Sequence, residues 1–274
     1  MTVKYVDAHC HIQFEQYAQD DIELIERMRE EGVAGIVVGV DLESSKKAVE
    51  LAEKHEHLFA SVGLHPNRVT DEIFDIETYL GFAKNNKVVA IGECGLDYYR
   101  PAKVNDEVKR AQIEALRTHI ELAAELDKPL IIHARPSKGL PAGRQGMMDA
   151  YSDLIEILKE EKIKHPNLRG DIHFFVGGIE EANLLIALGF TISFTAVITF
   201  ARDYDEVIKA VPLESILSET DAPYVAPSSR RGERNDPLAA VDVVAKIAEI
   251  RDEPLETVRT ALLANAKRLF ILKH

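Results

Sequence analysis

Two histidines near the start of the chain have a spacing suited to metal binding. His9 and His11 end an apolar segment that we expect to form a strand. Side chains alternate along a strand, so His9 and His11 are expected on one face. Ala8 and Cys10 would then point to the other. Neutral imidazole is the commonest metal-ligating side chain, so the pair supplies half of a metal site; the alternative is two solvated histidines at a polar strand end.

Other candidate ligands follow the predicted strands further along the chain. A histidine or an acid stands at or near the end of five more of these strands. Four histidines and two carboxylates can hold one divalent ion, or two ions that share a carboxylate, and we expect two. The expected metal ligands are His9, His11, Glu93, His133, His173 and Asp221, while His65 follows the third strand and is not assigned to a metal.

Glu93 is the expected bridge, because each ion can take one oxygen of its carboxylate. Ions in such a pair typically lie about 3.5–4 Å apart and generate hydroxide from bound water. Asp221 is expected to bind one ion and accept the proton of that water, a general-base role worth roughly 10²–10⁴-fold in rate. The alternative is an aspartate that caps a turn. Imidazoles suit Zn²⁺ and carboxylates suit Mg²⁺ or Mn²⁺, so the metal stays open among these three.

The elements that must position these residues alternate regularly. Apolar, often β-branched runs predict strands, and apolar residues spaced three and four apart predict helices between them. The predicted strands cover residues 3–11, 34–40, 58–63, 87–92, 129–132, 169–175, 190–194 and 215–218. The predicted helices cover residues 20–31, 43–55, 71–84, 105–126, 148–161, 180–188, 203–210, 238–250 and 256–270.

This alternation predicts an α/β protein, a (β/α)8 TIM barrel formed by residues 1–274 as a single hydrolase domain. In a parallel barrel the carboxyl ends of the strands share one rim, and active sites lie there. Because the candidate ligands come at strand ends, we expect them to meet on that rim. An open doubly wound sheet is the alternative, since counting elements does not demonstrate closure.

Composition limits the classes of function. With 33 basic and 46 acidic residues the net charge is −13, which argues against broad electrostatic wrapping of nucleic acid. No secretory signal or membrane-spanning segment is visible, and no obligate protein partner is evident. The low cysteine count, Cys10 and Cys94 alone, favours the reducing cytoplasm. Local basic groups remain at Arg230, Arg231 and Arg234, and at Arg135, Lys138 and Arg144.

Short motifs spread over nearly the whole chain resemble a known family. In order, they resemble the signatures of the TatD family of metal-dependent deoxyribonucleases, within the amidohydrolase superfamily. The motifs are Asp7-Ala8-His9-Cys10-His11, Gly63-Leu64-His65-Pro66, Gly92-Glu93-Cys94-Gly95-Leu96-Asp97-Tyr98-Tyr99, Ile132-His133-Ala134-Arg135, Glu219-Thr220-Asp221-Ala222-Pro223-Tyr224, Arg231-Gly232-Glu233-Arg234-Asn235-Asp236-Pro237 and Asn265-Ala266-Lys267-Arg268-Leu269-Phe270.

The resemblance implies a TIM barrel that hydrolyses phosphodiester bonds, with 3′-to-5′ removal of nucleotides from DNA ends. It implies that His65 lies near the substrate phosphate. For Arg135, a phosphate contact and a surface ion pair are both open, and we expect it to bind substrate. The implied ligand sets are His9, His11, Glu93 and Asp221 for one ion and Glu93, His133 and His173 for the other.

The sequence departs from the family pattern in two places near the expected rim. After His173, the family commonly has a small residue and, two positions later, a hydroxyl, whereas this chain has Phe174 and Val176. The loop 136–148 is also longer than usual. Both differences bear on the substrate more than on the metals.

Two other functions stay open. One is hydrolysis of a small cyclic amide, a lactone or a phosphorylated metabolite, although relatives of that kind often bridge their ions with a carboxylated lysine where this chain has Glu93. The other is a barrel retained as a binding scaffold. The remaining histidines are expected to be solvated: His55, His57, His119, His165 and His274.

Overall fold

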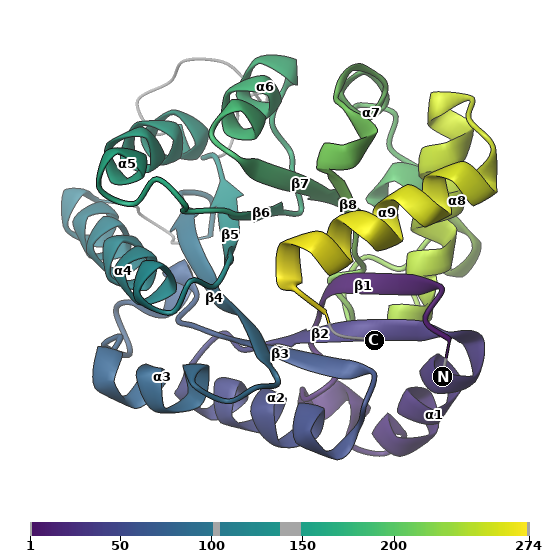
Figure 1. Ribbon diagram of the computed structural model, residues 1–274, viewed down its shortest axis with the longest axis horizontal. Coiled ribbons are helices and arrows are strands. Elements are labelled where there is room, and N and C mark those ends of the chain that lie inside the picture. The colour runs from purple at the N-terminus through teal and green to yellow at the C-terminus, as the bar shows by residue number, and fades with distance from the viewer. Residues whose placement is uncertain (1, 101–104, 138–148, 273–274) are drawn as a thin grey trace.

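The computed structural model describes residues 2–100, 105–137 and 149–272, and in these ranges eight parallel strands form one sheet in chain order (Figure 1). In a doubly wound sheet the strand order reverses part of the way through, so the sequential order excludes that alternative. It confirms the predicted barrel. The strands are β1 (Tyr5–Cys10), β2 (Val33–Val38), β3 (Leu58–Val62), β4 (Val88–Asp97), β5 (Leu130–Arg135), β6 (Gly170–His173), β7 (Phe190–Phe194) and β8 (Ile216–Ser218).

Helices alternate with the strands and surround them in Figure 1. Several begin at a side-chain cap: the Asp41 carboxylate accepts from the Ser44 N–H at 2.8 Å, and Asn105 Oδ1 accepts from the Val108 N–H at 2.9 Å. The α-helices are α1 (Asp21–Glu31), α2 (Leu42–Lys54), α3 (Ile76–Ala83), α4 (Asp106–Glu125), α5 (Ala150–Lys164), α6 (Ile179–Ala187), α7 (Asp205–Ala210), α8 (Ala240–Arg251) and α9 (Leu255–Phe270).

The barrel closes where the segment after β8 meets β1. The His11 N–H donates to the Ala222 carbonyl at 2.8 Å, and the Asp221 N–H donates to the His9 carbonyl at 2.9 Å. Thr220 adds a side-chain link, because its N–H and hydroxyl donate to the two oxygens of the buried Asp7 carboxylate at 2.9 and 2.6 Å. Residues 213 positions apart in the chain are therefore joined at this seam.

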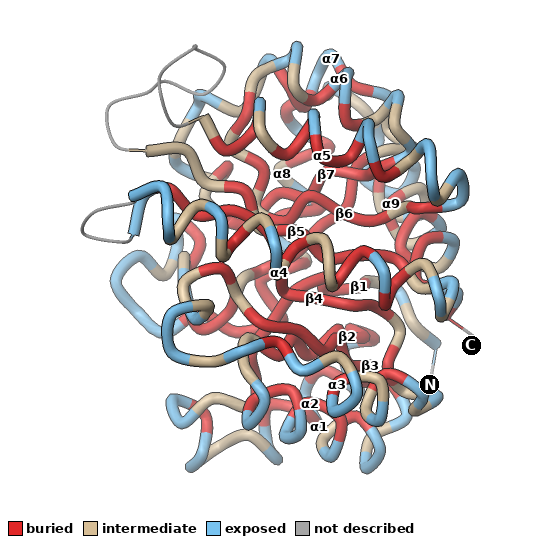
Figure 2. Tube along the Cα trace, turned by 90° about the vertical axis from the view of Figure 1, so that its left-hand side faces the viewer, coloured by how far each residue is buried: buried red, intermediate tan, exposed pale blue. Residues whose placement is uncertain are grey.

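Strands and inward helix faces form the buried interior, which is red along most of the strands in Figure 2. One apolar cluster fills the space between the strands and the helices, and a smaller one contains strand residues such as Ile36 and Leu217. Leu269 and Phe270, at the end of α9, belong to the smaller cluster. The terminal helix, yellow in Figure 1, therefore packs onto one end of the barrel.

Three details differ from the sequence prediction. Strand β4 continues to Asp97 rather than ending at Gly92. Helix α3 begins at Ile76, because the Asp75 carboxylate accepts from the Thr78 N–H and caps the helix there. The ladder between β1 and β2 is irregular after Asp7, and Ala8 and Cys10 lie in different apolar clusters, so strict alternation along β1 was wrong.

Two histidines that were expected to be solvated are buried. His57 Nε2 contacts the Ile25 carbonyl at 3.1 Å, and His119, which has no exposed surface, lies between two backbone groups. Its Nδ1 donates to the Ala115 carbonyl at 2.7 Å and its Nε2 accepts from the Leu64 N–H at 2.9 Å. Both rings are structural. His274 and most of the loop 136–148 lie outside the described residues.

Among the helices of the described ranges, none combines the length and the apolar character that crossing a membrane requires.

Candidate metal centre

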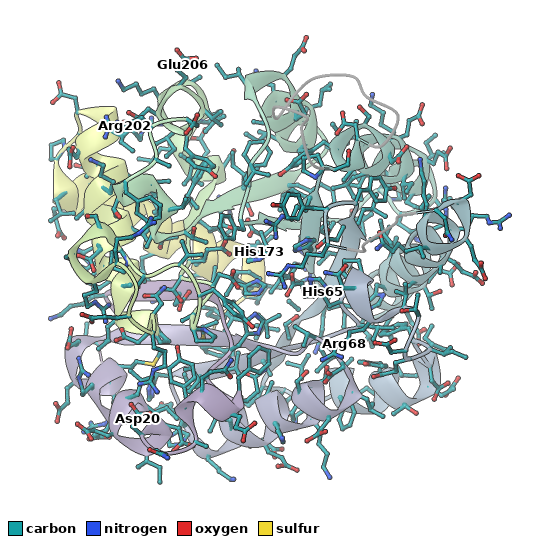
Figure 3. The ribbon with its side chains drawn as sticks, turned by 180° about the vertical axis from the view of Figure 1, so that it is seen from behind. Asp20, His65, Arg68, His173, Arg202 and Glu206 are labelled. Atoms are coloured by element: carbon teal, nitrogen blue, oxygen red, sulfur yellow. The ribbon has the colours of Figure 1, made fainter. Side chains whose placement is uncertain are left out.

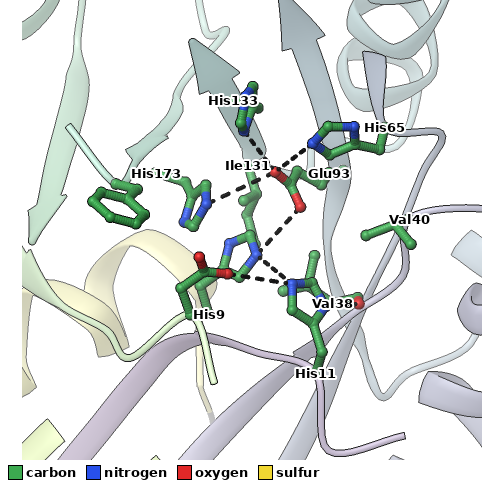
Figure 4. A network of polar contacts seen from close by, with 12 residues as sticks. His9, His11, Val38, Val40, His65, Glu93, Ile131, His133 and His173 are labelled. Atoms are coloured by element: carbon green, nitrogen blue, oxygen red, sulfur yellow. Dashed lines mark hydrogen bonds and ion pairs between the residues drawn. The ribbon is translucent and has the colours of Figure 1, made fainter. Parts of the chain in front are cut away.

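Glu93, near the middle of β4, is the carboxylate on which the predicted ligands converge (Figure 4). It is 3% exposed. Its Oε1 lies 3.0 Å from His133 Nδ1, 3.4 Å from His65 Nε2 and 3.8 Å from His173 Nε2. Its Oε2 lies 3.4 Å from His9 Nε2. One buried acid therefore faces four imidazoles from strands β1, β5 and β6 and the segment after β3.

Asp221 and His11 complete the arrangement on the other side of His9. His11 Nε2 lies 3.2 Å from His9 Nε2 and 3.5 Å from Asp221 Oδ1. Glu93 belongs to two compact ligand groups, in each of which the ligand atoms lie within 4.8 Å of one another. The groups are His9, His11 and Glu93, and Glu93, His133 and His173. A third joins His9, His173 and Asp221, and a fourth joins His65, Asp97 and His133.

The donor set fits divalent cations. His9 Nδ1 is buried and has no hydrogen-bond partner among the described residues, and its Nε2 approaches a second ring nitrogen, that of His11, at 3.2 Å. If one proton forms a hydrogen bond between the two Nε2 atoms, His9 Nδ1 still has no partner. Cations that accept several ring nitrogens and carboxylate oxygens at once satisfy this set better than hydrogen bonds do.

Hydrogen bonds on the far side of two rings fix which nitrogen faces the centre. His11 Nδ1 lies 2.8 Å from the Val38 carbonyl, an acceptor only, so Nδ1 carries the proton. His173 Nδ1 lies 2.9 Å from Oε2 of the fully buried Glu219. In both rings the proton points away, and the Nε2 lone pair is left for a ligand.

His133 has a similar partner that sequence reasoning missed. Its Nε2 lies 3.2 Å from Asp97 Oδ2, while its Nδ1 faces Glu93. Because Asp97 also accepts from the backbone N–H groups of Tyr99 and Arg100, its carboxylate is held in place. A prediction that β4 runs past Gly92 would have found Asp97, since it has the same strand parity as Glu93.

His65 has the opposite arrangement. Its Nδ1 accepts from the Asn67 N–H at 3.0 Å, so in the neutral ring the proton is on Nε2 and points toward Glu93. Burial lowers the pKa of His65 to about 3, even though Glu93 opposes this shift. The ring is therefore a neutral N–H donor over a wide pH range, unlike the three rings that present a lone pair.

Charges within the centre shift the other pKa values strongly. Burial raises the pKa of Glu93, but the imidazoles of His65 and His9 outweigh it, and the pKa falls well below its usual range. Burial lowers the pKa of His173, but the Glu219 and Glu93 carboxylates raise it to about 10. A cation that binds here therefore competes with a proton on His173.

A strained turn carries Asp221. Its φ is 53°, in the left-handed region, and the β-branched Val225 has the same φ. Asn235, which is fully buried, spans this turn: its Nδ2 donates to the carbonyls of Thr220 and Val225, each at 3.2 Å. The side chain of one asparagine thus holds the backbone on both sides of Asp221.

A cavity of about 790 Å³ opens onto the centre. Its wall includes the candidate ligands except His9, and it also includes Phe14, Phe174, Val176, Tyr204 and Tyr224. Figure 3 shows His65 and His173 near the centre of the molecule and Asp20, Arg202 and Glu206 at its periphery. A ligand with an apolar ring and a charged group suits such a wall.

Three arginines line the cavity, and two of them, Arg100 and Arg135, have no ion pair within the described ranges. The Arg135 guanidinium lies 4.0 Å from the centre of the Tyr99 ring. Arg68, the third, lies near Asp41 and Asp71. In a chain of net charge −13, these two guanidinium groups beside the centre offer positions where the negative groups of a ligand can bind.

The basic group formed by Arg230, Arg231 and Arg234 is mostly neutralised. Arg230 pairs with Asp236 at 2.7 Å, and Arg234 pairs with Asp20. Arg231 stacks over the Phe200 ring at 3.7 Å. Lys138 and Arg144 lie outside the described residues.

Comparison with known proteins supports the assignment to a family. The model of the TatD related DNase family matches residues 6–271. The uncharacterized metal-dependent hydrolase YabD of Bacillus subtilis is 37% identical over 96% of this chain and 98% of its own length. The crystal structure of YjjV, a TatD homolog from Escherichia coli, is 30% identical, with a TM-score of 0.85 and full coverage of both chains.

A more distant structure shows the same fold. The crystal structure of a hydrolase TatD family protein from Entamoeba histolytica is 24% identical to this chain. The two align over 98% of each chain with a TM-score of 0.82. The match of the family model to nearly the whole chain, together with the buried cluster of imidazoles and carboxylates on a barrel, shows that the chain belongs to the TatD related DNase family of metal-dependent hydrolases.

Proposed function

We propose that this protein is a two-metal phosphodiesterase that removes nucleotides from the 3′ end of DNA. The observation that carries the proposal is the position of Glu93, whose two oxygens face two different groups of imidazoles. A carboxylate in that position can serve two ions at once. Such a pair suits phosphoryl transfer, because the charge of a phosphodiester in the transition state is spread over several oxygens.

The proximity of the side chains supports the two ligand sets that we propose. His9, His11, Glu93 and Asp221 would hold one ion, and Glu93, His133 and His173 the other. Bound ions would activate water and neutralise charge on the substrate, and Mg²⁺, Mn²⁺ and Zn²⁺ all suit this mixed set of donors. Glu219 and Asp97 hold the rings of His173 and His133 in the orientation that this role requires.

Three side chains of the cavity are proposed to act on the substrate and the water. Asp221 accepts the proton of the attacking water, since its Oδ1 lies at the edge of the cluster and lines the cavity. His65 donates its Nε2–H to a phosphate oxygen, a role that its tautomer supports. Arg135 contacts a phosphate, because it lines the cavity without an ion pair in the described ranges.

DNA is the proposed substrate because the family that matches is named TatD related DNase and because Arg100 and Arg135, which have no ion pair in the described ranges, line the cavity. A strand end that enters the cavity needs few phosphate contacts, so the net charge does not oppose it. We further propose that residues 1–274 act as one domain, and cytoplasmic location stays a prediction.

The test is release of mononucleotides from single-stranded DNA by the purified protein, with its metal content measured by elemental analysis. We expect release with Mg²⁺ or Mn²⁺, none after treatment with a chelator, and recovery when the metal is restored. Oligonucleotides labelled at either end distinguish 3′ from 5′ removal. Absence of metal-dependent release from DNA and RNA would contradict the proposal, and turnover of a cyclic amide or lactone instead would favour that alternative.

A further inference from the structure

Phe174, the residue that follows the candidate ligand His173, is held in an unusual conformation at the wall of the cavity. Its φ is 47°, in the left-handed region that bulky residues rarely adopt. In this conformation the Cβ of an L-residue lies too close to the following carbonyl oxygen. Such strain persists only where neighbouring groups impose it, and it is concentrated at functional sites.

The groups that impose this conformation can be identified. Oε1 of Glu219 accepts from the Phe174 N–H at 2.7 Å, while Oε2 of the same carboxylate contacts His173 Nδ1. On the other side, the Phe175 N–H donates to the Ser193 carbonyl at 3.0 Å, and the Phe175 ring is fully buried. The turn at Phe174 places the His173 ring at the centre and the Phe175 ring in the core, while Phe174 itself lines the cavity.

The position of the Phe174 ring relative to the centre is also defined. Its centroid lies 5.9 Å from that of His173, and the two rings are nearly perpendicular, at 83°. Two other aromatic rings near the centre are already stacked: Phe14 lies parallel to His11 at 4.5 Å, and Tyr99 carries the Arg135 guanidinium. Tyr204 and Tyr224 also line the cavity but make edge-on contacts, and neither follows a candidate ligand directly in the chain. Within the described ranges, no aromatic ring is stacked on Phe174.

From this geometry we propose that Phe174 stacks on a nucleobase next to the scissile phosphate and so determines how tightly a strand end binds. The inference rests on the proposed phosphodiesterase function. A phosphate at the centre brings its flanking nucleosides into the cavity, where a rigid ring one residue from a ligand is available. Stacking of a base on an aromatic side chain requires no particular base, so the effect extends to all four nucleotides.

The test compares three oligonucleotides: an intact one, one that lacks the terminal base and one that lacks the next base. With metal-loaded enzyme, Phe174→Ala should raise KM for the intact strand about tenfold or more while kcat changes little. For the strand that lacks the stacked base, the same substitution should leave KM unchanged. Phe174→Tyr should restore the low KM, whereas Phe174→Leu, which keeps bulk but has no aromatic face, should not.

A binding measurement separates this inference from the proposed function. An oligonucleotide with 2-aminopurine beside a phosphorothioate linkage should lose fluorescence on binding the wild-type protein, and should lose less on binding the Leu variant. An equal rise in KM for all three strands, or a Leu variant that matches wild type in KM and fluorescence, would overturn the stacking role. If the wild type quenches fluorescence but releases no nucleotide from any strand, the stacking stands and the phosphodiesterase function fails.

Discussion

Asp97 Oδ2 lies 3.2 Å from His133 Nε2, at the end of strand β4, four residues beyond Glu93. The other oxygen of the carboxylate accepts from the backbone N–H groups of Tyr99 and Arg100 at 2.8 and 2.9 Å. The acid is fully buried. Its hydrogen bond holds the ring of His133 with Nδ1 toward Glu93, so Asp97 acts on the centre through its neighbour.

Replacing this acid should weaken metal binding without removing a ligand. Asp97→Asn keeps an oxygen for the backbone N–H groups but loses the charge that favours the Nε2–H form of His133. We expect metal affinity to fall about 10- to 100-fold, the usual cost of losing such a partner. Equilibrium dialysis with Mn²⁺ measures it, and Asp71→Asn, at an exposed position, is the control. Equal affinity for both variants would show that Asp97 has no such role.

Asp221→Asn tests the proposed proton acceptor. Asparagine has the size of aspartate and tolerates a φ of 53°, so the turn should be retained. The amide cannot accept the proton of water, and kcat at saturating metal should fall by about 10²–10⁴-fold. Thermal unfolding of the two proteins checks that the fold is kept. A variant that retains full turnover would exclude Asp221 as the base.

Asn235→Asp should destabilise the turn that carries Asp221. The substitution removes both donors to the carbonyls of Thr220 and Val225 and buries a carboxylate. We expect the free energy of unfolding to fall by about 2 kcal/mol or more. Urea denaturation measures the change, with the exposed Asn167→Asp as the matched control. An equal decrease in the free energy of unfolding in the two variants would show that these two hydrogen bonds do not stabilise the turn.

His119 should make stability depend on pH. Burial lowers its pKa to about 4 from an unfolded value of 6.5. Between these two pH values His119 therefore binds a proton in the unfolded chain but not in the folded chain. The stability of the folded state is complete above pH 6.5 and decreases as the pH falls toward 4, by roughly 3 kcal/mol in total. Relative to His119→Gln, the wild type should therefore lose stability between pH 7 and pH 4. Urea unfolding at both values measures this, and a constant difference would contradict it.

The order of the strands, and the ends of most of them to within a few residues, could be predicted because apolar β-branched runs are local features, whereas the end of β4 was misplaced. Once the barrel was expected, a common rim for residues such as His9 and Asp221 followed from topology. Hydrogen bonds that set the tautomers of the rings could not be predicted in this way. His11 depends on the carbonyl of Val38, and only the register of β1 and β2 brings the two together.

Two errors had signals in the sequence. His119 lies three residues after Leu116 and one before Ile120, on the apolar stripe of α4, so its burial could have been inferred from the helical period. Asp97 was missed because β4 was expected to end before Glu93. In the structure β4 stays paired with β5 as far as Asp97, and Gly95 permits the close approach, because an added Cβ there would lie 2.0 Å from the His133 carbonyl oxygen.

The seam between Asp7 and Thr220 has a consequence for the protein as it is being made. A growing chain that has not yet reached Thr220 lacks both the partner of Asp7 and the side chain of Asp221. His9 and His11 therefore leave the ribosome long before Asp221 does, and the nascent chain has only some of the candidate ligands. Pairing of the segment after β8 with β1 brings these residues together.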